Sequence, residues 1–229
     1  DALPIVEANN VEYKSQNEGV MHACGHDAHT ASLLGAARIL NELKSEFEGS
    51  IKLIFQPGEE KLPGGASLMI KEGVLENPKP NAVIGQHVMP LIPSGKVGFR
   101  SGIYMASTDE LYLRVKGKGG HGAMPHLNTD PVLITAHLIV AMQQIVSRIA
   151  NPTMPSVLSF GKVIANGATN VIPNEVYIEG TFRTLNEEWR SEAHQRMLEL
   201  AHQLVQSMGG ILEFEIRKGY PALVNDEIL

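Results

Sequence analysis

The pattern of apolar and polar residues changes along the chain near residue 105. Before it, residues 31–44 place their apolar side chains on one helical face, which predicts a buried helix. These side chains are Leu33, Leu34, Ala37, Leu40 and Leu43. The segments 49–60 and 81–90 are short β-rich runs, and 67–75 is a second helical run. This alternation predicts an α/β layer with a mainly parallel sheet, whose ligands bind at the carboxyl ends of the strands.

From about residue 106 the pattern predicts strands that alternate polar with apolar residues, and two amphipathic helices. Asp130-Pro131 is a start signal for the first helix, and glycines close the second. The expected elements are a strand (107–118), a helix (130–149), two strands (156–165 and 175–184), a helix (187–210) and a last strand (211–221). The order β-α-β-β-α-β is typical of the split-βαβ, ferredoxin-like arrangement.

The Gly- and Pro-containing segment 91–105 and the region near Gly219 are the expected domain boundaries. We therefore expect a catalytic α/β domain formed by residues 1–104 and 216–229, with a ferredoxin-like domain, 105–215, inserted into it. The chain starts at DALP and stops at DEIL, as if inside structural elements, so we expect a piece of a longer polypeptide, truncated at both ends.

Charge and composition exclude some partners. Nineteen basic against 25 acidic residues give a net charge of -6, which offers no broad cationic field to nucleic acid or an anionic membrane. No apolar run approaches the ~20 residues of a membrane-spanning helix. The single cysteine excludes an internal disulfide and favours a reducing compartment, so the expected location is the cytoplasm.

Metal-ligand side chains gather where the first domain's strands end. Cys24 and His26 lie in MHACGHDAHT, Glu60 follows the run that ends at 56, and His87 is near the end of the next run. They supply thiolate, imidazole and carboxylate, the ligand types of Zn²⁺ and its transition-metal neighbours. A CxH spacing alone is more often a packed pair, and adjacent carboxylates are usually a solvated turn. Their joint occurrence favours convergence at one sheet edge.

Glu59 and Glu60 are adjacent, and two buried like charges require a cation or a proton to offset their repulsion. Adjacent residues at the end of a strand point in different directions, so one carboxylate can ligate while the other serves as a general base. A hydrolase that uses Cys24 as a nucleophile with a histidine remains an alternative. It would resist a chelator and be blocked by alkylation.

Several motifs, taken in order, resemble the zinc aminoacylase and carboxypeptidase clan. They are DALP, MHACGHDAHT, QPGEE, GQHVMP, KGKGGHGAMPH followed by DP, NVIP with GTFRT, and YPALVND. Within the clan they are similar to the amidohydrolase branch: hippurate hydrolase, N-acyl-amino-acid amidohydrolase and the plant auxin-conjugate hydrolases. The resemblance implies a metal-dependent enzyme that cleaves the amide bond of small N-acyl amino acids.

For the first domain, the resemblance implies two divalent metal ions per subunit, most often Zn²⁺, with Mn²⁺, Co²⁺ or Ni²⁺ as options. The implied ligands are Cys24, His26, Glu60 and His87. Glu59 would be the general base, and Asp1 would orient a neighbouring site residue. The family's last ligand is a histidine in a segment that this sequence does not include.

For the second domain, the resemblance implies a lid that also forms a homodimer. His121, in a Gly-rich turn, would stabilise the oxyanion in the partner subunit's active site. Asn170 and Arg183 match the positions that hold the substrate's free carboxylate. His22 and His29 are interpreted as orienting partners or helix-surface residues, and the remaining histidines, His126, His137, His194 and His202, as ordinary helix or loop residues.

Two further functions remain open. A dipeptidase or carboxypeptidase of the same clan would share the site and differ in its pocket, although CGH favours the amidohydrolase branch. A non-catalytic metal-binding relative would not need Glu59.

Overall fold

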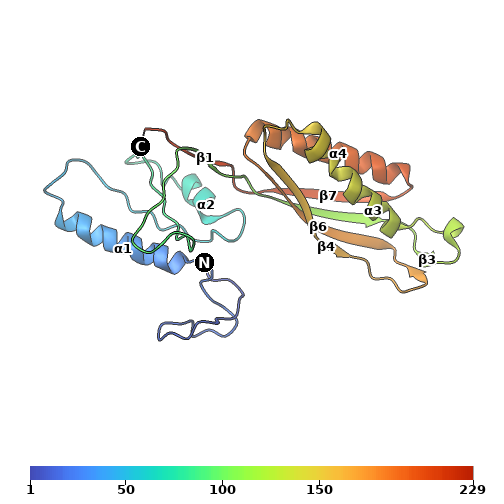
Figure 1. Ribbon diagram of the computed structural model, residues 1–229, viewed down its shortest axis with the longest axis horizontal. Coiled ribbons are helices and arrows are strands. Elements are labelled where there is room, and N and C mark those ends of the chain that lie inside the picture. Colours follow the sequence, from blue (N-terminus) through green and yellow to red (C-terminus); the bar gives the residue numbers. More distant parts are fainter. Residues whose placement is uncertain (229) are drawn as a thin grey trace. The chain divides into compact units, whose positions relative to one another are not determined.

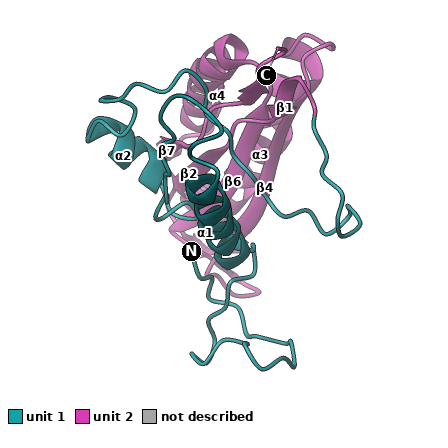
Figure 2. Cartoon of the chain, turned by 90° about the vertical axis from the view of Figure 1, so that its left-hand side faces the viewer, with its two compact units in different colours: residues 1–99, 229 teal, residues 100–228 magenta. Residues whose placement is uncertain are grey.

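The computed structural model describes residues 1–228, which form two compact units, 1–99 and 100–228 (Figure 2). The predicted inserted domain, 105–215, lies within the second unit, which also contains residues 100–104 and 216–228 that the sequence pattern assigned to the first domain. We describe each unit by itself.

The second unit is built on a four-stranded antiparallel sheet with the strand order β4-β6-β2-β7. Helices α3 and α4 lie together on one face of this sheet (Figure 1). In chain order the elements are β2 (Asp109–Lys116), α3 (Pro131–Met142), β4 (Ser156–Ile164), β6 (Glu175–Thr184), α4 (Glu187–Ser207) and β7 (Ile211–Lys218). This is the β-α-β-β-α-β order that the sequence pattern predicts.

The core of the second unit lies between the sheet and the two helices. Strand β2 alternates buried and half-buried residues along its whole length, because successive side chains point to opposite faces of a sheet. The core side chains are Leu111, Leu113, Val115, Ile134, Leu138, Met142, Ile145, Leu158, Val176, Ile178, Phe182, Trp189, Ala193, Met197, Ala201 and Val205. Each large apolar side chain among them contributes about 1.5–3 kcal/mol by leaving water.

Both helices of the second unit begin at a side-chain cap. The Asp130 carboxylate accepts from the N–H groups of Val132 and Leu133 at 2.8 and 3.2 Å, and Pro131 occupies the first helical position. The Asn186 side chain accepts from the N–H of Trp189 at 2.7 Å. Such caps satisfy donors that have no partner within the helix, each contributing about 1 kcal/mol.

Residues 131–149 are long and apolar enough to cross a membrane, contrary to the sequence-based expectation that no run approaches that length. They comprise α3 and a π-helical turn, η2 (Ile145–Ile149). Leu138, Met142 and Ile145 are each 0% exposed, packed in the core of the second unit. One side of this segment therefore packs in the core, whereas Val132, Leu133 and Val140 are exposed.

Two short ladders extend the second unit. Strand β1 (Gly102–Met105) pairs antiparallel with β8 (Leu223–Asn225). Strand β3 (Gly120–His121) pairs antiparallel with β5 (Val171–Ile172), and a 3₁₀ turn, η1 (Pro125–Leu127), follows β3.

The first unit contains two helices, α1 (His26–Glu42) and α2 (Gly65–Lys71), and an isolated bridge between Leu3 and Met21. The strands predicted within 49–60 and 81–90 are wrong for the described residues, since neither segment forms a ladder. No pair of described strands in the chain is parallel. A parallel strand depends on distant neighbours and on helices covering both faces, so β propensity alone does not form it.

Helix α1 forms where the spacing predicts a helix, but the prediction that it is buried is wrong here. It starts earlier, at His26, and none of its residues is buried. Leu34 is 54% exposed and Ile39 58% exposed. Because the described part of the first unit forms no sheet, the apolar face of α1 has no layer to cover.

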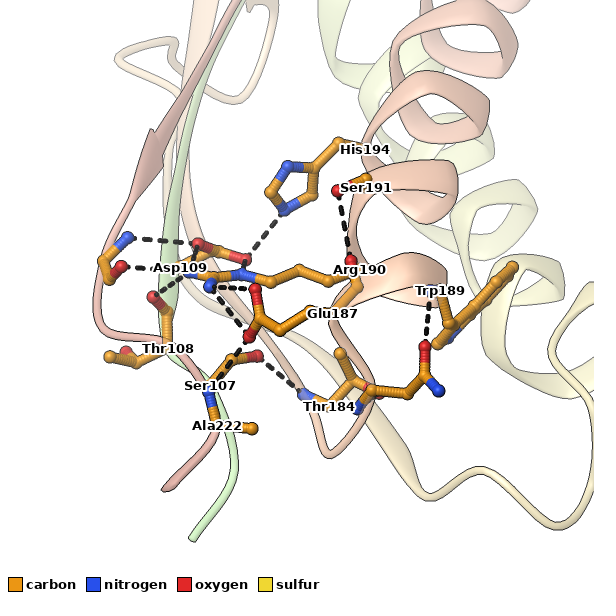
Figure 3. Close-up of polar contacts among 12 residues, drawn as sticks. Ser107, Thr108, Asp109, Thr184, Glu187, Trp189, Arg190, Ser191, His194 and Ala222 are labelled. Atoms are coloured by element: carbon orange, nitrogen blue, oxygen red, sulfur yellow. Dashed lines mark hydrogen bonds and ion pairs between the residues drawn. The ribbon is translucent and has the colours of Figure 1, made fainter. Parts of the chain in front are cut away.

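A buried ion pair lies at the start of β2. The Arg190 guanidinium, 1% exposed, donates to both carboxylate oxygens of Asp109, which is 0% exposed, at 2.9 and 2.5 Å. Arg190 also donates to both oxygens of Glu187, and His194 approaches Asp109 at 2.7 Å (Figure 3). Burial acts to raise the pKa of Asp109, but the hydrogen bonds from His194 and Arg190 outweigh it and lower this pKa from 3.8 to about 2.

The same cluster holds the two chain segments that border the sheet. Arg190 donates to the carbonyls of Thr108 and Gly219 at 3.2 and 3.1 Å. The N–H of Gly219 donates to Asp109, and the N–H of Ala222 donates to Glu187. The first turns of α4 thus fix both the entry to β2 and the exit from β7.

Candidate metal centre

Three segments that are distant in the sequence bring their reactive side chains together in the first unit. His26 Nε2 lies 3.6 Å from a Glu59 carboxylate oxygen and 3.9 Å from one of Glu60. Cys24 Sγ lies 3.4 Å from His87 Nε2. The five side chains from residues 24–26, 59–60 and 87 thus meet at one place.

These side chains form two overlapping groups that share His26. One ligand atom from each of Cys24, His26 and His87 lies within 4.8 Å of the others, and the same holds for His26, Glu59 and Glu60. Two adjoining sets of thiolate, imidazole and carboxylate donors are the chemistry that transition-metal ions accept.

Asp1 holds the turn that carries the two glutamates. Its two carboxylate oxygens accept hydrogen bonds from the backbone N–H groups of Glu59 and Glu60 at 3.2 and 3.1 Å. His26 Nε2 is directed to the carboxylates of these two glutamates. Asp1 therefore orients the carboxylate pair.

Two glycines permit close approaches around the centre. Gly25 has φ 91°, a left-handed conformation that lets α1 begin directly at His26, and a Cβ there would overlap the side chain of Val88. A Cβ on Gly65, at the start of α2, would overlap the carbonyl of Pro57. Gly25, the glycine of the CGH motif, thus allows close packing against Val88, while Cys24 and His26 on either side of it are candidate ligands.

The electrostatics of the centre favour a cation. Burial raises the pKa of the Cys24 thiol, and the nearby charges of Glu60 and Glu59 raise it further. A thiolate beside two carboxylates is unfavourable unless positive charge compensates it, and a divalent metal would supply that charge and deprotonate the thiol. The donor set therefore fits the metal ions that the sequence implies.

His29 is a residue of α1 that contacts the candidate ligand His87 and its neighbour Val88. Its Nε2 accepts a hydrogen bond from the N–H of Val88 at 2.9 Å, and its ring centroid lies 4.5 Å from that of His87. Burial lowers the pKa of His29, and the neighbouring imidazoles of His87 and His26 lower it further. The sequence allowed this orienting role without identifying the partner.

The second unit places His121 beside Asn170. His121 is in β3, and the N–H of its neighbour Gly122 donates to the Asn170 carbonyl at 2.8 Å. His121 Nδ1 accepts a hydrogen bond from the N–H of Ala123 at 3.1 Å. The neutral imidazole therefore carries its proton on Nε2, which can donate to a ligand.

Arg183 lies at the other end of the sheet. In the register of β6 with β2, Glu175 faces Lys116 at the end that leads to β3, while Phe182 faces Asp109 at the opposite end. Arg183 is thus about 26 Å along β6 from Glu175 at roughly 3.3 Å per residue. Within one chain, Arg183 and Asn170 therefore lie near opposite ends of the sheet.

Sequence reasoning missed the Asp109–Arg190 pair and took His194 as an ordinary helix residue. The sequence contained a signal for this pair. Asp109, Leu111 and Leu113 occupy alternate positions of one strand, so their side chains point to the same, core-facing side of the sheet. A carboxylate at a core-facing position requires a buried partner.

The relatives found by comparison with known proteins agree with one another. The sequence profile of peptidase family M20/M25/M40 matches residues 1–229. An N-acyl-L-amino acid amidohydrolase of Geobacillus stearothermophilus is 44% identical over 98% of this chain and 60% of its own length. An N-acetyl-L-cysteine deacetylase of Bacillus subtilis is 43% identical over 100% of this chain and 54% of its own. A solved Bacillus subtilis structure, described as a dinuclear metal binding peptidase from the M20 family, is 35% identical with a TM-score of 0.77, covering 99% of this chain and 57% of that one. The chain thus spans somewhat over half the length of these relatives.

Proposed function

We propose that this chain, which belongs to peptidase family M20/M25/M40, functions in a metal-dependent amidohydrolase that removes the acyl group from N-acyl amino acids. The observation that carries the proposal is the convergence of Cys24, His26, Glu59, Glu60 and His87 from three distant segments. The N-acyl amino acid substrates named for the relatives support the substrate class.

Cys24, His26, Glu60 and His87 would hold the metal ions, with Zn²⁺ as the first candidate because thiolate and imidazole suit it. When bound, such ions polarise the amide carbonyl and favour ionisation of a water molecule. Glu59 is the general base in this proposal. Its carboxylate takes the proton of the attacking water as the new C–O bond forms, and then delivers this proton to the nitrogen of the leaving amino acid as the amide C–N bond breaks.

His121 donates through Nε2 to the oxyanion that develops on the amide oxygen. Since Asn170 lies beside His121, we assign both to the same substrate site. Arg183 would bind the free carboxylate of the amino acid through its bidentate guanidinium. Because Arg183 is at the far end of β6, one substrate can meet all three residues only if two chains contribute.

This separation supports a homodimer in which the second unit serves as both lid and dimerisation domain. Strand β4 is at an edge of the four-stranded sheet, and its backbone is available for pairing with a second copy. The lid, the dimer and a cytoplasmic location belong to the proposal.

The test is amide hydrolysis by the metal-reconstituted full-length protein on a panel of N-benzoyl, N-acetyl and longer N-acyl amino acids, with dipeptides included. Glu59→Gln keeps the size of the side chain and removes its basicity, so kcat should fall by about 10²–10⁴-fold with unchanged metal content. A chelator should abolish the parent activity.

Glu46→Gln is the matched control, because Glu46 is an exposed glutamate of the first unit. It should leave both kcat and metal content unchanged. Equal activity of Glu59→Gln and the parent would remove the general-base assignment. Cleavage of dipeptides alone would move the substrate class to peptides, and activity that survives the chelator but not alkylation would favour the cysteine nucleophile.

A further inference from the structure

The peptide unit of Val88, directly after the ligand His87, is held from two sides. The Val88 N–H donates to His29 Nε2 at 2.9 Å. The Val88 carbonyl lies 2.7 Å from His87 Nδ1, and because a carbonyl can only accept, His87 Nδ1 is the donor. Both backbone groups of Val88 thus connect one histidine to the other.

The second contact fixes the tautomer of His87. With its proton on Nδ1, the neutral imidazole presents the lone pair of Nε2, the atom that lies 3.4 Å from Cys24 Sγ. The chemistry and the direction of this ligand atom therefore depend on where the Val88 carbonyl is held.

Helix α1 sets that position. His29 is one turn into α1, and its ring lies against the His87 ring at 64° with a centroid distance of 4.5 Å. Gly25, just before α1, approaches the Val88 side chain so closely that a Cβ would overlap it. The helix that begins at His26, two residues after Cys24, thus also anchors the loop of the third ligand.

From this geometry, and resting on the metal centre of the proposed function, we infer that His29 is a positioning residue for His87. It acts as the acceptor for the Val88 N–H, and through the Val88 peptide it holds His87 Nε2 toward Cys24. His29 itself binds no metal in this scheme, because its Nε2 is already used.

The experiment compares His29→Leu with His29→Gln in the full chain. Leucine fills a similar volume without an acceptor, whereas the glutamine amide oxygen can accept the Val88 N–H. His22→Leu is the control, an exposed histidine of the same MHACGHDAHT stretch. The first readout is Zn²⁺ affinity by competition with a chromogenic chelator. The second is the thiolate-to-Co²⁺ charge-transfer band of the Co²⁺-loaded protein, which reports on the site that contains Cys24. Circular dichroism of the metal-free variants checks their folding.

We expect His29→Leu to weaken Zn²⁺ binding by about 10- to 100-fold and to change the Co²⁺ band, as loss of an orienting partner does at other metal sites. His29→Gln and His22→Leu should stay close to the parent.

Parent-like affinity in His29→Leu would overturn the inference, and so would equal losses in His29→Leu and His29→Gln, because the acceptor would then be irrelevant. A parent chain that binds no divalent metal would overturn both this inference and the metal centre. A parent that binds metal but hydrolyses no amide would contradict the proposed function alone, and the comparison of the His29 variants would still decide the inference.

Discussion

Replacing Arg190 with methionine should destabilise the second unit strongly. Methionine retains most of the apolar stem of arginine and removes the guanidinium. The substitution breaks the contacts with Asp109, with Glu187 and with the carbonyls of Thr108 and Gly219.

The expected cost follows from what remains around Asp109. Its carboxylate is 0% exposed and would keep only His194 and the N–H of Gly219 as partners. Removing one member of a buried pair leaves an uncompensated charge and costs about 3–5 kcal/mol. With a urea m-value of about 1.5 kcal/mol per molar, the unfolding midpoint should fall by about 2–3 M.

The single tryptophan makes the measurement specific to this unit. Trp189 is 4% exposed in the core of the second unit, and its indole N–H donates to Ser156 Oγ at 2.9 Å. Its fluorescence during urea unfolding therefore reports on the second unit even if the first unfolds separately.

Arg196→Met is the control. Arg196 is on the same helix and pairs with Glu192 one turn away, but its side chain is 47% exposed. Exposed helix pairs contribute only about 0.3–0.5 kcal/mol, so this midpoint should move little. If Arg190→Met shifts the midpoint no more than Arg196→Met does, the buried pair does not stabilise the unit and the reasoning fails.

Acid provides a second test of the same pair. The pKa of Asp109 is lowered in the folded state, from 3.8 to about 2, so the unfolded state binds more protons between these values. The resulting stabilisation, about 2 kcal/mol, is fully present above pH 4 and is lost as the pH falls toward 2. Without Arg190, fewer hydrogen bonds oppose the effect of burial, so the pKa of Asp109 rises. The stability of Arg190→Met should therefore fall less steeply than that of the parent between about pH 4 and pH 2, and equally steep curves would contradict the assignment.

Two further predictions concern the candidate site. Cys24→Ser should weaken metal binding, because the Sγ atom 3.4 Å from His87 Nε2 is replaced by a poorer ligand, and unchanged metal stoichiometry and affinity would remove Cys24 from the ligand set. Arg183→Ala should raise KM for N-acyl amino acids with a free carboxylate but not for their amides, with kcat little changed. Equal effects on both substrate series would make Arg183 structural.

The second unit was predictable because its decisive signals are local. The strand 175–184 coincides with β6, and the Asp130-Pro131 signal marks the start of α3, because alternation, capping residues and proline act over a few residues. The convergence of Cys24, His26 and His87 was also expected from residue types, although it was expected at a sheet edge that the described residues of the first unit do not form.

What the sequence did not reveal depends on distant partners. The segments 49–60 and 81–90 have strand composition, yet they form no ladder in the described residues, because a ladder requires a neighbour that composition does not specify. The separation of Arg183 from Asn170 follows from strand register, which becomes visible only once the sheet is assembled. The bond from Val88 to His29 joins residues 59 positions apart, and no local pattern encodes it.

The pairing of β1 with β8 has a consequence for the order of folding. It joins Gly102 to Asn225 and so closes a loop of roughly 120 residues. The entropy of closing so long a loop is recovered only after the intervening chain has become compact, which here means after the four-stranded sheet and its helices have formed. This ladder is short and forms last during folding, so it should also be the first to open. The second unit can lose it while its core remains folded.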